Sequence, residues 1–277
     1  MTTDAVSAPR VRIDSSTSVD GLMITLADGV LSITMNRPDS LNSLTEAMLT
    51  GIADAVERAA DDDRVRVVRL GGAERGFSSG AGIGEEDQKG GGTSSPTKII
   101  DEANRAVRAL TALPKPAVAV VHGPAAGVAA SLALGCDVVL ASEDAFFMLA
   151  FTKIGLMPDG GASALVAAAV GRTRAMRMAL LADKIHADEA FRAGLVTAVY
   201  PADELDAEVD RVIATLVRGP VVALAKTKDA INASTLTELE GALEREHSGQ
   251  AALLRGTDYR EGIKAFQERR AANFTDS

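Results

Sequence analysis

The chain of 277 residues is 47% hydrophobic and 24% charged, so it holds enough apolar side chains for a sizeable core and is not a wholly disordered protein. Its 38 acidic residues outnumber its 29 lysines and arginines, and the resulting formal charge of −9 excludes a generic binder of nucleic-acid phosphates. The single cysteine, Cys136, cannot form an intrachain disulfide or a thiolate cage, so we expect a reducing compartment, the cytoplasm, and no metal site.

No stretch of the chain reaches the roughly 18 consecutive apolar residues of a membrane span. The N-terminal sequence MTTDAVSAPR also lacks the basic region of a secretory signal, so we expect neither a membrane partner nor export. Residues 1–18 are rich in Ser, Thr and Asp and have no hydrophobic period, which predicts a loose tail.

The first elements are a hairpin, a helix and a strand. Residues 22–26 and 30–35 are rich in apolar and β-branched side chains and flank Asp28-Gly29, a dipeptide typical of tight hairpin turns. Apolar residues at helical spacing predict a helix over 44–59, and residues 65–70 have the composition of the next strand.

A glycine-rich segment interrupts this pattern. Residues 71–96 contain nine glycines and little periodicity, which in a compact domain is typical of a functional loop. Beyond it, the sequence predicts helices over 98–113 and 127–134, strands over 117–121, 137–141, 145–148 and 195–200, and helices for most of the chain from residue 160 onward.

Alternation of strands and helices in the first half predicts an α/β fold whose sheet is connected by right-handed crossovers. We divide the chain into the tail (1–18), an α/β core (19–201) and a C-terminal helical region (202–277). The helical region covers the core or packs on a neighbouring subunit.

Two glycine-rich signals have the wrong context for the motifs they imitate. Gly76-Phe77-Ser78-Ser79-Gly80 fits the G-x-S-x-G pattern of serine hydrolases, but five residues separate it from the preceding strand and it opens no helix. Gly80-Ala81-Gly82-Ile83-Gly84 lacks the spacing of a dinucleotide-binding turn. A hydrolase and a nucleotide-cofactor enzyme of these kinds are therefore disfavoured.

Two turns of small residues follow strands, at 77–82 and 122–130. The second is predicted to pass straight into a helix, whose first N–H groups lack intrahelical partners and attract negative charge. Small residues allow a ligand oxygen to approach such amides, so the turns suit an anion or a developing oxyanion. Close packing of the backbone explains the same composition, and the residues alone leave both interpretations open.

Asp159 lies in a turn, residues 153–161, between apolar residues and a predicted helix. A carboxyl group in an apolar wall has a raised pKa, which suits a base that takes and returns a proton. An aspartate before a helix is also a common N-cap. Both interpretations stay open at this point.

Taken together, these segments resemble the crotonase superfamily, the enoyl-CoA hydratase/isomerase family. The similarity covers nearly the whole chain after the tail. It rests on the Asn36-Arg37-Pro38 turn with residues 41–44, the F-x-x-G-A-D-like loop 77–82, the second turn 123–129, Cys136-Asp137, and the closing helix 261–270.

The resemblance implies a spiral of repeated ββα units, a C-terminal helical trimerisation region, a homotrimer or dimer of trimers, and an acyl-CoA thioester substrate without a separate cofactor. It assigns an oxyanion hole for the thioester oxygen to the backbone N–H groups of Ala81 and Val128. It also implies substrate contacts at Arg37, Ser40, Leu41, Ser79, Gly82, Ile83, Gly127, Phe151, Phe266 and Arg269.

Departures from the family pattern indicate the reaction. The two glutamates of the hydratases are replaced by Ser131 and Phe151, whereas Asp159 falls where certain isomerases and dehalogenases of the family carry their catalytic carboxylate. Val128 replaces the usual glycine, and we expect its β-branched side chain to narrow the pocket. Gly82 stands where the loop motif has aspartate, and Arg269 replaces a lysine that meets CoA phosphate in relatives.

The resemblance therefore implies an enzyme that shifts a double bond by a 1,3-proton transfer through a thioester enolate. Asp159 would remove a proton from the α-carbon and return it at the γ-carbon, while Ala81 and Val128 hold the oxygen. The alternatives within enzymes are hydration of a 2-enoyl-CoA and isomerisation of a ring-epoxide CoA ester. The alternative of another class is a non-catalytic acyl-CoA binding subunit.

Overall fold

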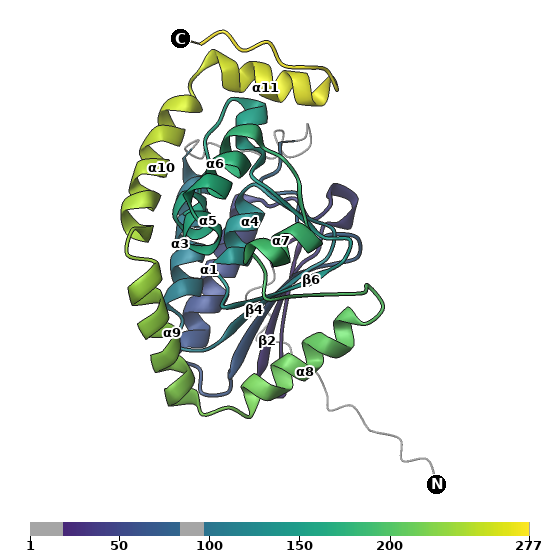
Figure 1. The fold of residues 1–277 in the computed structure, drawn as a ribbon, viewed down its shortest axis with the longest axis vertical. Coiled ribbons are helices and arrows are strands. Elements are labelled where there is room, and N and C mark those ends of the chain that lie inside the picture. The colour runs from purple at the N-terminus through teal and green to yellow at the C-terminus, as the bar shows by residue number, and fades with distance from the viewer. Residues whose placement is uncertain (1–18, 84–96, 277) are drawn as a thin grey trace.

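The structure, a computed structural model, describes residues 19–83 and 97–276. The predicted tail and most of the glycine-rich segment beyond Ile83 lie outside these residues. A six-stranded sheet forms the centre (Figure 1). Its strands, in spatial order, are β1 (Leu22–Ala27), β2 (Val30–Met35), β3 (Val67–Gly72), β4 (Ala117–Val121), β6 (Val138–Ser142) and β9 (Ala198–Tyr200).

The β1–β2 pair is antiparallel, which confirms the hairpin around Asp28-Gly29, and the pairings from β2 to β9 are parallel. A second sheet of three strands lies beside the first, in the order β5 (Pro124–Ala126), β7 (Phe146–Met148) and β8 (Ile185–His186). Successive strand pairs divide between the two sheets, because β4 and β6 join the large sheet while β5 and β7, which follow them, join the small one. The predicted spiral of ββα units is therefore confirmed.

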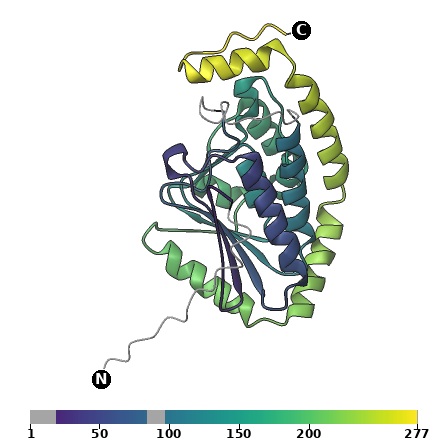
Figure 2. The same ribbon diagram turned by 180° about the vertical axis from the view of Figure 1, so that it is seen from behind.

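Helices cover the large sheet on both faces. On one face lie α1 (Glu46–Asp61), α3 (Lys98–Ala112) and α4 (Val128–Leu134), and Figure 2 shows α1 and α3 side by side. The hydroxyl of Thr45 caps α1 by accepting a hydrogen bond from the Met48 N–H (3.2 Å). The other face is covered by α8 (Leu205–Val217), which packs apolar side chains against the strands through Val67, Val118, Val120, Leu140, Leu205, Val209 and Ile213.

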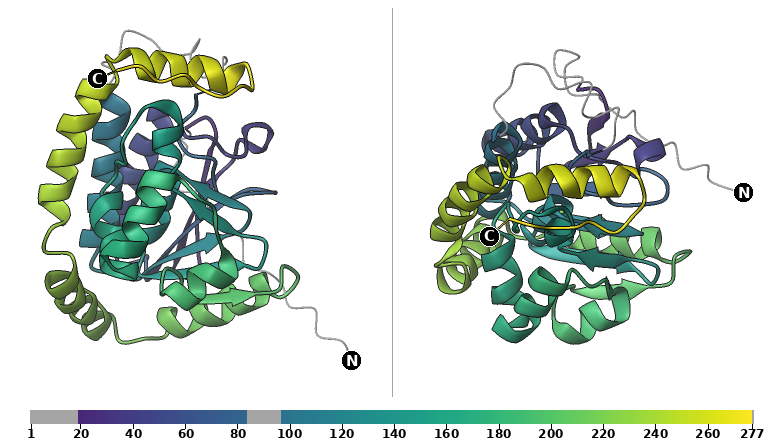
Figure 3. Two further views of the ribbon diagram at one scale, coloured as in Figure 1. Left: turned by 45° about the horizontal axis from the view of Figure 1, so that its top comes forward. Right: turned by 90° about the horizontal axis from the view of Figure 1, so that it is seen from above.

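The remaining helices lie near the second sheet or along the outside of the molecule. They are α5 (Ala162–Val170), α6 (Arg172–Leu181), α7 (Ala187–Ala193), α9 (Val221–Thr235), α10 (Leu239–Leu253) and α11 (Thr257–Gln267), with short 3-10 turns at Pro38–Ser40 (η2) and Ala150–Ile154 (η3). Figure 3 shows α10 along the outside and α11 across one end. None of the helices in residues 19–83 and 97–276 is long and apolar enough to cross a membrane.

The expected passage of the segment 122–130 into a helix is confirmed, because α4 begins at Val128 with Gly127 as its N-cap. What the sequence did not predict is strand β5 within this segment, which pairs with β7 in parallel. Three residues are too few to give a periodic signal in the sequence, so this strand depends on its tertiary partners.

Candidate active site

Two neighbouring turns carry Ala81 and Val128. The segment before Ala81 runs beside β5, because the Ser78 N–H donates to the Pro124 carbonyl (2.9 Å) and the Ala126 N–H donates to the Ser78 carbonyl (3.0 Å). Gly80 has a positive φ of 92° and packs so tightly that a Cβ there would lie 2.6 Å from the Ala126 carbonyl oxygen. The residues that follow these two contacts, Ala81 and Val128, are consequently neighbours in space.

The turn around Ala81 is held on its other side by the opening segment of the chain. The Leu44 N–H donates to the Gly80 carbonyl (2.8 Å) and the Gly82 N–H donates to the Leu44 carbonyl (3.0 Å). Within the described ranges, the N–H groups of Ala81 and Val128 donate to no carbonyl or side chain. Unpaired backbone N–H groups in two adjacent turns are free to donate hydrogen bonds to an oxygen that bears negative charge.

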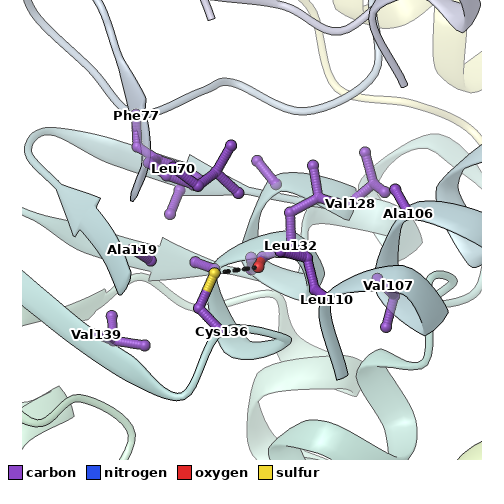
Figure 4. Close-up of a cluster of buried hydrophobic side chains, with 14 of the residues drawn as sticks. Leu70, Phe77, Ala106, Val107, Leu110, Ala119, Val128, Leu132, Cys136 and Val139 are labelled. Atoms are coloured by element: carbon purple, nitrogen blue, oxygen red, sulfur yellow. Dashed lines mark hydrogen bonds between the residues drawn. The ribbon is translucent and has the colours of Figure 1, made fainter. Parts of the chain in front are cut away.

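The side chain of Val128 packs mainly in the core, and its effect on the width of the pocket stays a prediction. Its side chain is 3% exposed and belongs to the main hydrophobic core, and Figure 4 shows it in one cluster with Leu110, Leu132 and Cys136. Val128 is also the first residue of α4, and the positive φ of this turn falls on Gly127 (55°). The side chain of Val128 is therefore part of the core, and the valine needs no positive φ at this position.

Asp159 is buried at the base of α4. A Cβ built on the next residue, Gly160, would lie 3.0 Å from Ser131 Cβ and 3.4 Å from Val128 Cγ2, so this turn packs directly on the helix that carries the second amide. The Ser131 hydroxyl donates to the Asp159 carbonyl (2.8 Å), and Gln250 Nε2 donates to Asp159 Oδ2 (3.0 Å). The other carboxyl oxygen, Oδ1, is buried and has no hydrogen-bond partner among the described residues.

The surroundings of Asp159 favour its protonated form. Burial raises the pKa of Asp159 to about 7; the hydrogen bond from Gln250 opposes this rise, and the negative charge of Glu246 adds to it. A carboxyl group with a pKa near neutrality holds and releases a proton with similar ease at physiological pH. Such a group is suited to general acid–base chemistry.

The N-cap interpretation of Asp159 is wrong. Helix α5 begins at Ala162 with Gly161 as its N-cap. Its free amides are taken by Glu246, whose Oε2 accepts from the Gly161 N–H (2.6 Å) and whose Oε1 accepts from the Ser163 N–H (2.8 Å). Because a glutamate from another helix performs the capping, the Asp159 side chain is not needed for that purpose.

The two positions that replace hydratase glutamates do not offer a second base. The Ser131 hydroxyl is fully buried and committed to the Asp159 carbonyl. Phe151 is 7% exposed, and its ring lies over the turn before α4, since a Cβ on Gly127 would be 3.7 Å from Phe151 Cζ. The ring is apolar and offers no group that could bind or activate water.

Five of the predicted substrate contacts lie together in the opening turn and the loop beside it. The Ser79 N–H donates to the Leu41 carbonyl (2.9 Å), and the Ser79 hydroxyl donates to the Ser40 carbonyl (3.0 Å). Arg37 is turned toward its own segment, where Nη1 donates to the carbonyl (3.0 Å) and hydroxyl (2.8 Å) of Ser43. Gly82 joins them through its bond to Leu44.

The closing helix approaches this group at the end of the glycine-rich loop. Gln267 Nε2, in α11, donates to the Ile83 carbonyl (3.3 Å), which brings the helix beside the loop. On this helix Phe266 is 57% exposed, and Arg269, just past its end, is exposed with a positive φ of 54°. The structure thus places eight of the ten predicted contacts in two adjoining groups, one around Ser79 and one beside Gln267, while Gly127 and Phe151 lie against each other before α4.

Sequence reasoning missed Glu246 and Gln250, which are each 1% exposed. Both lie on the buried face of α10. A signal was present, because polar side chains at positions 246 and 250 continue an apolar stripe at helical spacing, formed by Leu239, Ala242 and Leu243. Buried polar residues on such a stripe have partners, and here the partners belong to the Asp159 turn.

The spiral of two sheets, with paired turns at the strand ends, defines the class of protein: this is a crotonase-type enzyme fold. The family model described as enoyl-CoA hydratase/isomerase matches residues 25–277. The chain therefore belongs to the enoyl-CoA hydratase/isomerase family of enzymes.

Individual relatives carry more than one activity name. The 1,2-epoxyphenylacetyl-CoA isomerase of Escherichia coli (strain K12) is 36% identical over 249 residues, covering 89% of this chain and 95% of that protein. A Rhodobacter capsulatus protein named "Probable enoyl-CoA hydratase" is 39% identical over 250 residues, covering 90% and 96%. The crystal structure of an enoyl-CoA hydratase from Mycobacterium avium subsp. paratuberculosis K-10 is 67% identical, with a TM-score of 0.88 over 94% of this chain and 100% of that one.

Proposed function

We propose that this protein shifts a double bond in an acyl-CoA thioester by a 1,3-proton transfer. The N–H groups of Ala81 and Val128 hold the thioester oxygen as the carbonyl becomes an enolate, and Asp159 moves the proton. The observation that carries the proposal is the buried Asp159 carboxyl, whose pKa is raised to about 7 beside the helix that bears the second amide.

The proton path balances with one carboxylate. Asp159 removes a proton from the α-carbon of a 3-enoyl ester, and the electron pair moves into the carbonyl to give the enolate. The protonated acid then returns the proton at the γ-carbon, the double bond moves into conjugation, and the carboxylate is regenerated. Polarisation by two amides acidifies the α-carbon, and removing one such donor costs other enzymes about 2.7–4 kcal/mol.

Hydration of a 2-enoyl ester is a weaker candidate. That reaction needs a group that activates water while another protonates the carbon. Near Asp159, the Ser131 hydroxyl is already bonded and Phe151 presents an apolar ring. The same features that remove a second base keep the proton transfer dry.

Isomerisation of a ring-epoxide CoA ester is the second candidate, and the 36% identity to the 1,2-epoxyphenylacetyl-CoA isomerase favours it. It would use the same amides and the same acid, with the proton delivered to an epoxide oxygen. A non-catalytic acyl-CoA binder is disfavoured by the raised pKa of Asp159, since binding alone needs no buried acid.

We infer that the substrate contacts are those of the two adjoining groups, with Phe266 and Arg269 toward the CoA moiety. The guanidinium of Arg269 suits a phosphate. Coenzyme A is part of the substrate, so the reaction requires no further cofactor. The free, buried Cys136 is consistent with a cytoplasmic protein.

We further propose a homotrimer or dimer of trimers in which the C-terminal helices contribute to the contacts. Exposed apolar side chains on α6 and α9 support this assembly, namely Leu180 (65%), Leu181 (64%), Val222 (69%) and Ile231 (57%). Light scattering measures the oligomeric state directly, and a stable monomer would contradict the proposed assembly.

The decisive experiment measures the position of a deuterium label in the product and the effect of replacing Asp159. In ordinary water, a 3-enoyl-CoA deuterated at the α-carbon should give the conjugated 2-enoyl isomer with deuterium at the γ-carbon, because the same carboxyl carries the label. The Asp159→Asn variant should lose this reaction while it keeps its affinity for the CoA ester. Parallel assays test the alternatives. Formation of a 3-hydroxyacyl product from a 2-enoyl-CoA would support hydration instead, and isomerisation of a ring-epoxide CoA ester would support the ring-epoxide reaction. No turnover of any of the three substrates would support the non-catalytic binder.

A further inference from the structure

Helix α10 places two buried polar side chains against the Asp159 turn. Glu246 and Gln250 stand one helical turn apart, and each is 1% exposed. The sequence separates Gln250 from Asp159 by 91 residues, yet their side chains are in contact. Burying two polar groups in one interface is costly unless all their hydrogen bonds are made, so their arrangement is specific.

The orientation of the Gln250 amide is fixed by the backbone. Its Oε1 accepts from the Met157 N–H (3.1 Å), a group that can only donate. The amide oxygen must therefore face Met157, and the NH2 group must face Asp159, where Nε2 lies 3.0 Å from Oδ2. In a flipped amide, the NH2 group would face the Met157 N–H, which is also a donor. The amide oxygen would then face Asp159 Oδ2, which is also an acceptor.

This orientation determines which Asp159 oxygen can carry a proton. Oδ2 already accepts a hydrogen bond from Gln250, so binding a proton there is less favourable than binding it at an oxygen without a donor. Oδ1 is buried and has no partner among the described residues, so it is the oxygen at which a proton can be bound. We propose that Gln250 is a positioning residue of the proton transfer: it holds Oδ2 as an acceptor and leaves Oδ1 to take and return the substrate proton.

Glu246 has a complementary part in this arrangement. Its carboxylate is held by the Gly161 and Ser163 amides, and its charge favours the protonated form of Asp159. Within the described part of the chain, Glu246 is the charged group that acts on Asp159, and Arg245 acts in turn on Glu246. One helix thus supplies both the donor that favours the ionised acid and the charge that opposes ionisation.

This inference rests on the proposed function of Asp159, so the test measures the acid and the reaction separately. Carbon-13 NMR of labelled aspartate gives the pKa of Asp159 in the whole protein without substrate, and the pH profile of kcat gives it during turnover. Gln250→Glu keeps an acceptor for the Met157 N–H but opposes Oδ2 with a second acceptor. Gln250→Met removes both bonds at nearly the same length.

Both variants should raise the pKa of Asp159 by about one unit, which lowers kcat roughly 10-fold at a pH below the midpoint and leaves KM unchanged. Glu246→Gln should move the pKa in the opposite direction, because it removes a negative charge. The matched controls are Ser248→Glu and Glu244→Gln, which make similar changes on the exposed face of α10 and should move neither measurement.

Opposite shifts from the two sites support the positioning role, since a general loosening of the helix would move both in one direction. If Gln250→Glu and Gln250→Met leave the pKa of Asp159 unchanged while Asp159→Asn abolishes the double-bond shift, the positioning role is overturned and the proposed function stands. If the pKa rises in both but Asp159→Asn keeps full turnover, the proposed function is overturned and the positioning role falls with it.

Discussion

The backbone conformation of Gly80 determines where the next residue, Ala81, places its N–H group. The Gly80→Ala variant tests this dependence. At its φ of 92° an L-residue is strained by about 1–3 kcal/mol. The new Cβ would also lie 2.6 Å from the Ala126 carbonyl oxygen, closer than real Cβ contacts, so backbone must move. Forcing a group into a packed site costs a further ~1–3 kcal/mol.

The displaced segment carries the Ala81 N–H, so activity should fall along with stability. We expect the free energy of unfolding in urea to drop by roughly 2–6 kcal/mol in Gly80→Ala, from the two costs combined. We expect kcat to drop by up to about 100-fold. Complete loss of such a donor costs about 100-fold or more, and in this variant the donor is displaced rather than removed.

Gly171→Ala is the matched control for strain. Gly171 has a φ of 77°, and nothing lies within 4 Å of the position its Cβ would take. This variant should lose about 1–3 kcal/mol of stability and keep full activity. Equal stability losses in the two variants, with unchanged kcat in Gly80→Ala, would refute the claim that close contact at Gly80 positions the amide.

Three further predictions concern buried groups. Because the pKa of Asp159 is about 7 in the folded chain and 3.8 in its ordinary state, the unfolded state ionises first, and the folded state loses stability as pH rises between these values. Asp159→Asn should therefore gain stability relative to the parent by up to roughly 4 kcal/mol between about pH 4 and pH 8, measured by urea unfolding; a pH-independent difference would contradict the raised pKa. Phe151→Ala should cost about 3–5 kcal/mol of stability and, by admitting water, increase the hydrated by-product of a 2-enoyl-CoA assay, whereas unchanged product ratios would show that the ring does not exclude water. Lys228 in α9 is 8% exposed and donates to the Leu110 carbonyl (2.8 Å) and to Asp137 Oδ2 (3.0 Å), so Lys228→Met should lower the free energy of unfolding by about 3–5 kcal/mol with little change in kcat. A neutral effect on unfolding would show that this bridge does not anchor α9.

Local patterns predicted most of the elements near the site. The hairpin at Asp28-Gly29, the helix over 44–59 and the buried strand over 117–121 follow from turn chemistry and hydrophobic period, and the structure has each of them. Strand β8 has two residues, so it gives no such signal and exists only through its pairing with β7. Short elements stabilised by tertiary partners are beyond what period alone can predict.

The candidate site divides in the same way. Two turns of small residues and an acid, Asp159, in an apolar wall were visible in the chain itself, and the family resemblance then assigned the two amides to Ala81 and Val128. The direction of the Val128 side chain and the partners of Asp159 depend on packing between distant segments. Glu246 lies 85 residues from Gly161 in the sequence, so no local pattern links them.

The division of labour between backbone and side chains explains how one fold can accommodate more than one reaction. The two amides are placed by strand pairing and by the positive φ of Gly80 and Gly127, which do not depend on the side chains at 81 and 128. Under the proposed function, the acid–base groups are side chains at separate positions, 131, 151 and 159. Substitutions at these positions would then change the activation of water without changing the proposed stabilisation of the enolate. In this chain only Asp159 of the three carries an acid, so the surroundings that α10 provides for that one carboxyl become the main control over the chemistry.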